Sequence, residues 1–379
     1  MAGAILGPIV PQIESELGVS GTAAGLIITA HGGVIVVTSP VLGALIDRTG
    51  PRRPFIGGLI VYGIGGGAGL VADSFGTLLL SRVVLGVGTA AVYTSITVLI
   101  YTLYEGQPME RALGYRSSAN SAGAAVWPLV GGAAGTVAWN VPFGVYLVAL
   151  PLGALAVLTV PKSAAQSAAH GDAQSSEGTA AGLSSRVRGT LAVFQRQPPL
   201  VLVYLLYFGA NVFLYAVVVF YPRLLSTIGV TSSFSISLYL AANGAAGGVS
   251  AALYDRLLKL LSRTSLITVA FLLWLLGFSA AVVTDTVFGA LFPVIMLGLG
   301  IGLVFPSTFA LVEEFAPPDK QGQFSSYVAS FGYTGQFVSP LLFGPLVPLF
   351  GIGGVFGVAG GVAGLAATGL ILWGVVQAR

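Results

Sequence analysis

The chain has 379 residues, of which 55% are hydrophobic, 8% are charged and none is cysteine. A soluble domain carries about 25% charged residues, so this composition predicts an exterior that faces lipid. The lack of cysteine excludes disulfides and thiolate metal sites, and a net charge of +3 from dispersed residues argues against nucleic-acid binding.

Residues 1–13 are uncharged and apolar, but they extend only about 20 Å as a helix against a hydrocarbon core of about 30 Å. The segment has no basic start and is a poor signal peptide. We expect the second half of a first span. The beginning of that span is either missing from this sequence or not needed, and we favour a mis-assigned start.

Uncharged runs predict the other spans, because a charge at mid-bilayer is unfavourable. The runs 117–161 and 321–378 are long enough for two helices each, with turns expected at residues 140–142 and 350–351. We therefore expect an all-α integral membrane protein with eleven full spans after the partial one, twelve in all. They begin near residues 22, 55, 76, 118, 142, 199, 232, 265, 287, 324 and 352.

Basic residues predict the orientation, because cytoplasmic loops carry an excess of Lys and Arg. Placing residues 45–54 in the cytoplasm leaves only Arg223 outside and Arg82 within the membrane. Both ends of the complete chain are then cytoplasmic, in a cell membrane. The basic residues on the cytoplasmic side are Arg48, Arg52, Arg53, Arg111, Arg116, Lys162, Arg186, Arg188, Arg196, Arg256, Lys259, Arg263, Lys320 and Arg379.

One segment is not membrane-like. Residues 163–185 have the Ala, Ser, Gly and Gln content of a flexible linker, and Leu183 to Gln197 could form a basic amphipathic helix on the membrane surface. We expect a six-helix N-terminal half at 1–161, a cytoplasmic linker at 162–198 and a six-helix C-terminal half at 199–379.

The two halves repeat short patterns in one order and at nearly one offset, between 208 and 212 residues. This indicates a duplicated six-helix unit, which suits alternating access around a midplane site. The pairs are 17–20 with 228–231, 43–48 with 251–256, 85–88 with 297–300, and Gly123, Pro128 and Gly132 with Gly335, Pro340 and Gly344.

The run Gly43-Ala-Leu-Ile-Asp47-Arg48-Thr-Gly50-Pro-Arg52-Arg53 resembles the loop between spans two and three of the major facilitator superfamily (MFS). A degenerate copy, Asp255-Arg256, follows span eight. The resemblance implies an MFS-type bundle of six plus six helices, in which Asp47 and the basic residues form a cytoplasmic gating latch. The alternative is that the arginines only determine topology.

Arg82, in Leu80-Ser-Arg82-Val-Val-Leu85-Gly86-Val-Gly88, is similar to the fourth-span arginine that this family links to proton transfer. It could hold an anionic substrate or act on a neighbouring acid. The alternative is an arginine that extends toward the outer surface.

A fifth-span pattern resembles that of drug–proton antiporters, with Trp127 where a glycine is expected. Glycine and proline in such a motif bend and closely pack a helix, so ordinary packing is the alternative reading. The motif residues are Gly114, Gly123, Trp127, Pro128, Gly131 and Gly132.

Few polar residues are available for a site between the halves. His31 is either a proton carrier or a neutral core residue. Each of the others could instead make interhelical hydrogen bonds. The candidates for the substrate cavity are Asn120, Tyr207, Asn211, Tyr215, Asn243, Tyr333 and Gln336.

Enzymatic signatures are missing: there is no GxxxxGK phosphate loop, and two histidines cannot form a histidine metal cluster. We expect no cofactor and no metal. All 13 acids lie in loops or at span ends, so an intramembrane proton acid is absent, lies in missing sequence or is replaced by His31.

The sequence favours a monomeric, proton-coupled exporter of amphipathic small molecules in the lipid bilayer. The alternatives are an uptake symporter for a metabolite or anion and a non-transporting membrane sensor.

Overall fold

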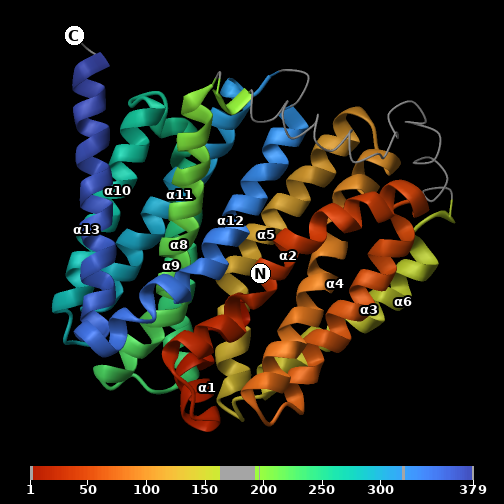
Figure 1. The fold of residues 1–379 in the computed structure, drawn as a ribbon, viewed down its shortest axis with the longest axis horizontal. Helices are drawn as coiled ribbons and strands as arrows, with labels where there is room; N and C mark the ends of the chain where they lie inside the picture. Colours follow the sequence, from red (N-terminus) through yellow and green to blue (C-terminus); the bar gives the residue numbers. More distant parts are fainter. Residues whose placement is uncertain (1–2, 163–192, 196, 318–320, 378–379) are drawn as a thin grey trace.

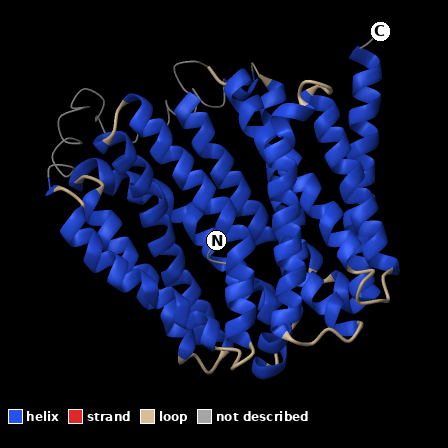
Figure 2. Ribbon diagram, turned by 180° about the vertical axis from the view of Figure 1, so that it is seen from behind, coloured by secondary structure: helices blue, strands red, loops and turns tan. Residues whose placement is uncertain are grey.

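The computed structural model describes residues 3–162, 193–195, 197–317 and 321–377, and every regular element among them is helical (Figure 2). The expected amphipathic helix at 183–197 lies mostly outside the described residues. The N-terminal elements are η1 (Ala4–Ile9), α1 (Val10–Leu17), α2 (Gly21–Thr49), α3 (Arg52–Gly67), η2 (Ala68–Leu70), α4 (Phe75–Leu103), α5 (Gly106–Gly135), η3 (Val141–Val148) and α6 (Ala149–Thr159).

After the linker, six helices complete the bundle. They are α8 (Pro198–Thr227), α9 (Ser233–Leu257), α10 (Arg263–Val283), α11 (Leu291–Phe315), α12 (Gln321–Phe343) and α13 (Leu346–Gln377). We call η1–α6 the N-terminal half and α8–α13 the C-terminal half. Figure 1 shows them side by side, with the chain start at mid-height of the bundle.

Each of the eleven expected full spans corresponds to a helix, or to a 3-10 helix continued by an α-helix. Eight described segments are long and apolar enough to cross a membrane by those criteria alone. The expectation was wrong about the fifth span, since α5 begins at Gly106 and not near residue 118. Arg111 and Arg116 therefore belong to the helix and not to a loop. The physical reason is that a charged side chain ends an uncharged run without ending a helix.

Two breaks separate the last two long helices, and one of them is the break expected at residues 350–351. The turn lies at residues 344–345, and α13 then breaks at Gly351, which has φ 69° and ψ −179°. Glycine adopts this backbone conformation without the steric penalty of a side chain. The expected break at Gly351 is therefore present, and the long stretch of α13 begins after it, where the last span was expected.

The same packing pattern occurs in both halves. In the N-terminal half α4 packs on α2 and α3, and in the C-terminal half α11 packs on α9 and α10. A side chain at Gly86 would approach the carbonyl oxygen of His31 at 3.0 Å, and one at Gly298 would overlap that of Asn243. Both residues of the second pair lie 212 positions after those of the first. The repeat in the sequence is therefore also a repeat in helix packing.

The two halves meet along α2 with α12 and along α5 with α9. These contacts lie toward the end of the bundle where α2 and α9 begin. A side chain at Gly25 would overlap Pro340 and one at Gly344 would overlap Thr22. Toward the opposite end, where the α2–α3 loop lies, the described parts of α4 and α11 do not form a packed pair. The halves are thus joined at one end and separated at the other.

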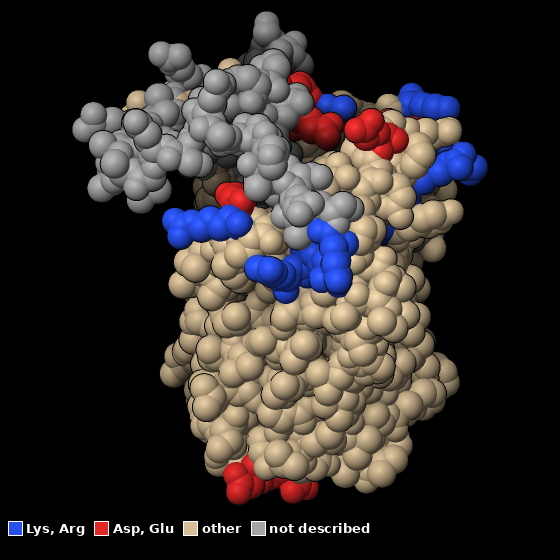
Figure 3. Space-filling view, turned by 90° about the vertical axis from the view of Figure 1, so that its right-hand side faces the viewer, with Lys and Arg blue, Asp and Glu red and all other residues tan. Residues whose placement is uncertain are grey.

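Charge divides the surface in the same direction. In Figure 3 Lys and Arg lie at one end together with several Asp and Glu, a broad band without charged residues follows, and the charged residues seen at the far end are acidic. Such a band fits the hydrocarbon core of a bilayer. The end with the α2–α3 loop is the basic one, and we call it the inner end, and the other the outer end.

Candidate functional site

The polar residues of α8 and α12 form a connected group between these helices. The side-chain amide of Gln336 donates a 3.0 Å hydrogen bond to Oδ1 of Asn211, and the Asn211 amide donates to the carbonyl oxygen of Tyr207 at 2.9 Å. The spacing of Tyr207 and Asn211 predicted that they share one face of the helix, and both contact α12 at Gly332. The amides are therefore held in place at the edge of α12.

Aromatic rings of α11 extend this group. The ring of Tyr207 lies 5.0 Å from that of Phe305 and 5.7 Å from that of Phe309, measured between centroids. Phe309 is 45% exposed, so the surface formed by these three rings is not fully buried within the C-terminal half. Such surfaces provide apolar contact area for a ligand with a ring.

Residues of the N-terminal half complete the site. The rings of Tyr93 in α4 and Tyr333 in α12 meet edge to face at 6.1 Å, which links the two halves. The guanidinium carbon of Arg116 in α5 lies 4.6 Å from the centroid of Tyr93. We name Tyr93, Arg116, Tyr207, Asn211 and Tyr333 the inner cluster. It joins α4, α5, α8 and α12 where the separated ends of the halves begin.

The remaining cavity candidates lie elsewhere. Tyr215 is buried, and Asn243 is also buried and donates to the carbonyl oxygen of Val294 at 2.8 Å. His31 is 2% exposed and packs near Gly3 and Gly86. Asn120 is exposed and lies one helical turn from Arg116. Of these four, only Asn120 is accessible from the side where the halves separate.

Arg82 lies inside the N-terminal half with 1% exposure. It donates to the carbonyl oxygen of Gly66 at 2.8 Å and to Oγ of Ser81 at 3.1 Å. Its guanidinium also lies 4.8 Å and 5.1 Å from the ring centroids of Phe143 and Tyr146. No acid of the described structure forms an ion pair with it. Arg82 therefore ties α4 to α3 and η3, and its role in coupling stays a prediction.

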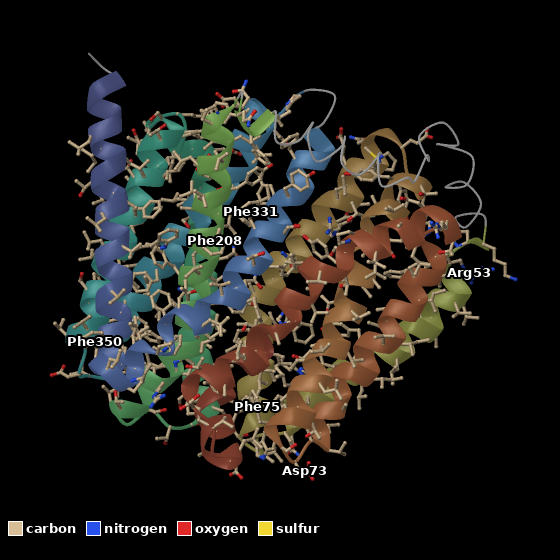
Figure 4. All side chains as sticks on the ribbon, viewed as in Figure 1. Arg53, Asp73, Phe75, Phe208, Phe331 and Phe350 are labelled. Carbon is tan, nitrogen blue, oxygen red and sulfur yellow. The ribbon has the colours of Figure 1, made fainter. Side chains whose placement is uncertain are left out.

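The loop motif contacts its own half. Arg52 donates two 2.8 Å hydrogen bonds, to the carbonyl oxygens of Val157 and Val160 at the end of α6. Cations stabilise helix C-termini, where carbonyl groups lack partners. Gly50 has φ 72°, which favours glycine. Figure 4 places Arg53 at the inner end, far from Asp73.

Asp47, the acid of the loop motif, is exposed, and so are the two residues of the second-half copy. Asp47, Arg48, Asp255 and Arg256 lie near the inner ends of α2 and α9 and form no ion pair within the described structure. The lack of ion pairs among these described residues agrees with the separation of the two halves at their inner ends.

The fifth-span motif packs tightly at its outer part. A side chain at Gly131 would overlap the carbonyl oxygen of Ile5, and one at Gly132 would overlap Ser237 in α9. Ser233 donates to the carbonyl oxygen of Gly132 at 2.9 Å. Gly123 and Pro128 are buried, whereas Gly114 is exposed and Trp127 is 37% exposed. The motif thus brings α5 against η1 and the other half.

Sequence reasoning missed an ion pair at the outer end. Arg223 in α8 lies 3.3 Å from Glu14 in α1, between nitrogen and carboxylate oxygen, and so connects the halves. An open depression of about 480 Å³ surrounds it, with Val19 and Thr227 in its lining. No motif marked this pair, although each residue is a charged group near an outer span end.

The inner cluster contains further residues that were missed. Tyr93 belongs to a long apolar helix, and Arg116 was considered only as a basic residue of the cytoplasmic side. The spacing of Arg116 and Asn120 by four residues, which places them on one helical face, could have identified the arginine.

Two similarly packed halves of long apolar helices, with a polar and aromatic cluster between them, define the described part of the chain as a polytopic helical membrane protein. The chain belongs to the Major Facilitator Superfamily, whose family model matches residues 1–340.

Curated relatives include proteins named for drug resistance and for export. Quinolone resistance protein NorA of Staphylococcus aureus is 25% identical over 351 residues, which cover 89% of this chain and 84% of NorA. The Bacillibactin exporter of Bacillus subtilis is 28% identical over 150 residues, or 38% of this chain and 37% of that protein. The match thus spans little more than a third of the first two curated relatives.

Solved structures have the same fold at low identity. A mutant of the nucleoside transporter NupG aligns with a TM-score of 0.77 at 12% identity, over 98% of this chain and 95% of that one. A D-xylose-proton symporter aligns with a TM-score of 0.77 at 14% identity, over 97% and 93%. At these identities the likeness supports the fold alone.

Proposed function

We propose that this protein exports amphipathic small molecules in exchange for protons. Membership of the family makes it a small-molecule transporter that works by alternating access. The observation that carries the export proposal is the inner cluster, whose rings and amides lie where the joined outer parts of the two halves give way to the separated inner ends. Weakly polar aromatic surfaces suit varied amphipathic ligands, and the similarity to the Bacillibactin exporter supports outward transport.

The proposal includes an arrangement in the membrane. The inner end, with the α2–α3 loop, is cytoplasmic, as are both termini of the complete chain. Residues 1–161 and 199–379 are the two moving units, joined by the linker 162–198. The excess of basic residues at the inner end supports this orientation.

An uptake symporter is the second candidate. The solved structures with this fold include a D-xylose-proton symporter. Arg82 or another cation of the bundle would then bind the substrate. Inward accumulation in intact cells would favour this candidate over export.

Proton movement in inverted membrane vesicles tests the export proposal. We expect that adding a transported compound collapses a preformed pH gradient, because each exchange moves protons out of the vesicle lumen. The panel contains lipophilic cations, neutral aromatic compounds and aromatic anions. Vesicles with an Asn211→Leu variant are the control, because this change removes the amide that Gln336 contacts. No gradient change with any compound, from protein that is folded and present, would contradict proton-coupled export.

A further inference from the structure

Arg116 is a cation at the inner face of the bundle, and the described structure gives it no acidic partner. It lies ten residues after the start of α5, or about 15 Å along the helix axis. Its side chain is half-buried and forms neither of the two ion pairs of the described structure. The guanidinium therefore keeps some contact with solvent and lacks a counter-charge within the described structure, so it can pair with the negative charge of a ligand.

The guanidinium is oriented for such a ligand. One of its faces covers the ring of Tyr93, a cation–π contact that holds the planar group in a defined position. The contact leaves the N–H edges free, since no hydrogen bond of the described structure uses them. Those edges match the two oxygens of a carboxylate in a bidentate arrangement.

The surroundings of Arg116 provide ring contacts. Tyr333 meets Tyr93, the ring on which Arg116 lies, edge to face at 6.1 Å. Tyr207 and Phe309 continue the aromatic surface on the facing half. Planar ligands gain by stacking or edge contact with such rings.

No acid of the described structure forms an ion pair with the inner cluster, although Glu110 in α5 lies six residues before Arg116 and Glu313 in α11 lies four residues after Phe309. The described acids lie in loops or near helix ends, as the sequence predicted; in α5, for example, Glu110 is four residues after the helix start while Arg116 is ten. In α11, Glu314 lies at the helix end and is already paired with Arg263. The fixed charge at the inner cluster is therefore positive.

We propose that the inner cluster binds planar aromatic carboxylates, with the carboxylate on Arg116 and the ring among Tyr93, Tyr333 and Tyr207. This substrate class rests on the proposed transport function, which it makes more specific. It differs from a site for lipophilic cations, which would need a carboxylate or an uncharged wall where Arg116 stands.

Equilibrium binding to the purified full chain in nanodiscs tests the proposal without requiring transport. The probes are 2-naphthoate, its uncharged analogue 2-naphthamide and the cation 2-naphthylmethylammonium, which share one ring system. We expect naphthoate to bind most tightly and the ammonium least. In Arg116→Gln, naphthoate affinity should fall about ten- to a hundredfold, because a hydrogen-bonded charge pair is lost, while naphthamide affinity changes less than about twofold.

Two further variants keep the test decisive. Arg111→Gln removes the same charge from an exposed position on the same helix and should leave all three affinities unchanged. Arg116→Lys keeps the charge without the planar fork and should restore part of the naphthoate affinity. In Tyr93→Leu, naphthoate and naphthamide affinities should fall together, because both probes lose the ring contact.

Equal loss of naphthoate and naphthamide binding in Arg116→Gln would overturn the proposal, because it would indicate damage to the fold. So would unchanged naphthoate binding in that variant, or tighter binding of the ammonium probe to the natural chain. Naphthoate binding that depends on Arg116, together with no proton exchange in vesicles, would instead support the site and contradict the export function. The two proposals can therefore fail separately.

Discussion

Arg82 is among the largest side chains that are almost fully buried, and its partners are neutral. It rests on backbone carbonyls of α3 and on two rings of η3, Phe143 and Tyr146. A buried charge needs such compensation, because removing it from water is unfavourable. Arg82 of the fourth-span motif therefore has a structural role, holding α4 to α3 and η3, that does not depend on a substrate.

A substitution at Arg82 distinguishes this structural role from a role in proton coupling. Arg82→Met keeps much of the apolar side-chain volume and removes the side-chain donors to the carbonyl oxygen of Gly66 and to Ser81. We expect a loss of about 1–3 kcal/mol of stability, measured as a lower apparent melting temperature in detergent. Arg53→Met, at an exposed position, is the control. Lost transport at an unchanged melting temperature would instead favour a role in coupling.

At the scale of elements, the bundle is joined at its outer end by two kinds of contact. Glycines let α5 approach η1 and α9 closely, and Glu14 of α1 reaches Arg223 of α8. Close packing holds the helices together strongly in lipid, but it does not depend on particular polar partners. An ion pair, in contrast, can separate when water reaches the two charges. The pair therefore suits an outer gate that must release in each cycle.

Charge reversal tests this gate. Glu14→Arg or Arg223→Glu alone places like charges together, and the double exchange restores the pair in reverse. Each single variant should shift the closed-to-open ratio about fivefold, since a partly exposed pair contributes up to about 1 kcal/mol. Spin labels at Val71→Cys and Phe288→Cys report on the outer end, because these residues are 84% and 86% exposed and belong to different halves. A double exchange that behaves like the single variants would contradict the pairing.

The sequence patterns predicted the helices more accurately than they predicted the contacts between helices. The uncharged runs identified the spans, because lipid imposes one simple rule on every helix. They failed at the start of α5, where charged side chains lie on a continuing helix. The partnership of Glu14 and Arg223 was not predictable either, because it depends on how two halves meet and neither residue belongs to a recurring motif.

Only part of the candidate site was predicted, again because the sequence does not show how helices contact one another. Tyr207 and Asn211 follow from helical spacing, and the structure brings them to Gln336. Asn243 was a reasonable cavity candidate by position, yet it makes a buried bond to α11. Only the rotation of each helix decides which side chains face the other half, and a single sequence carries little information about rotation when most positions are apolar.

At the scale of the whole molecule, the repeated packing indicates two stiff units. The pair Gly86 and His31 and the pair Gly298 and Asn243 are close backbone approaches at equivalent places. Close-packed contacts of this kind resist deformation. Motion should therefore occur between the halves and not within them, as alternating access requires.

Two pairs of spin labels test this rigid-body motion. The chain has no native cysteine, so each label site is unique. The outer pair is Val71→Cys with Phe288→Cys, and the inner pair is Tyr104→Cys with Leu260→Cys, at exposed positions in different halves. We expect any condition that lengthens the outer distance to shorten the inner one. A label pair within one half, Val71→Cys with Tyr104→Cys, should not change. Inner and outer distances that vary independently would contradict rocking of two units.

The distribution of charge along the bundle also has an electrical consequence. The acids of the described structure stay near the surfaces, and Arg116 is the half-buried cation at the inner cluster. A substrate anion would therefore be the negative charge that crosses the bilayer, accompanied by little movement of fixed protein charge. With the cell interior negative, each 100 mV contributes about 2.3 kcal/mol to the outward passage of one such charge. Export of a monoanion would then draw on membrane voltage, and dissipating the potential would slow it even when the pH gradient is maintained.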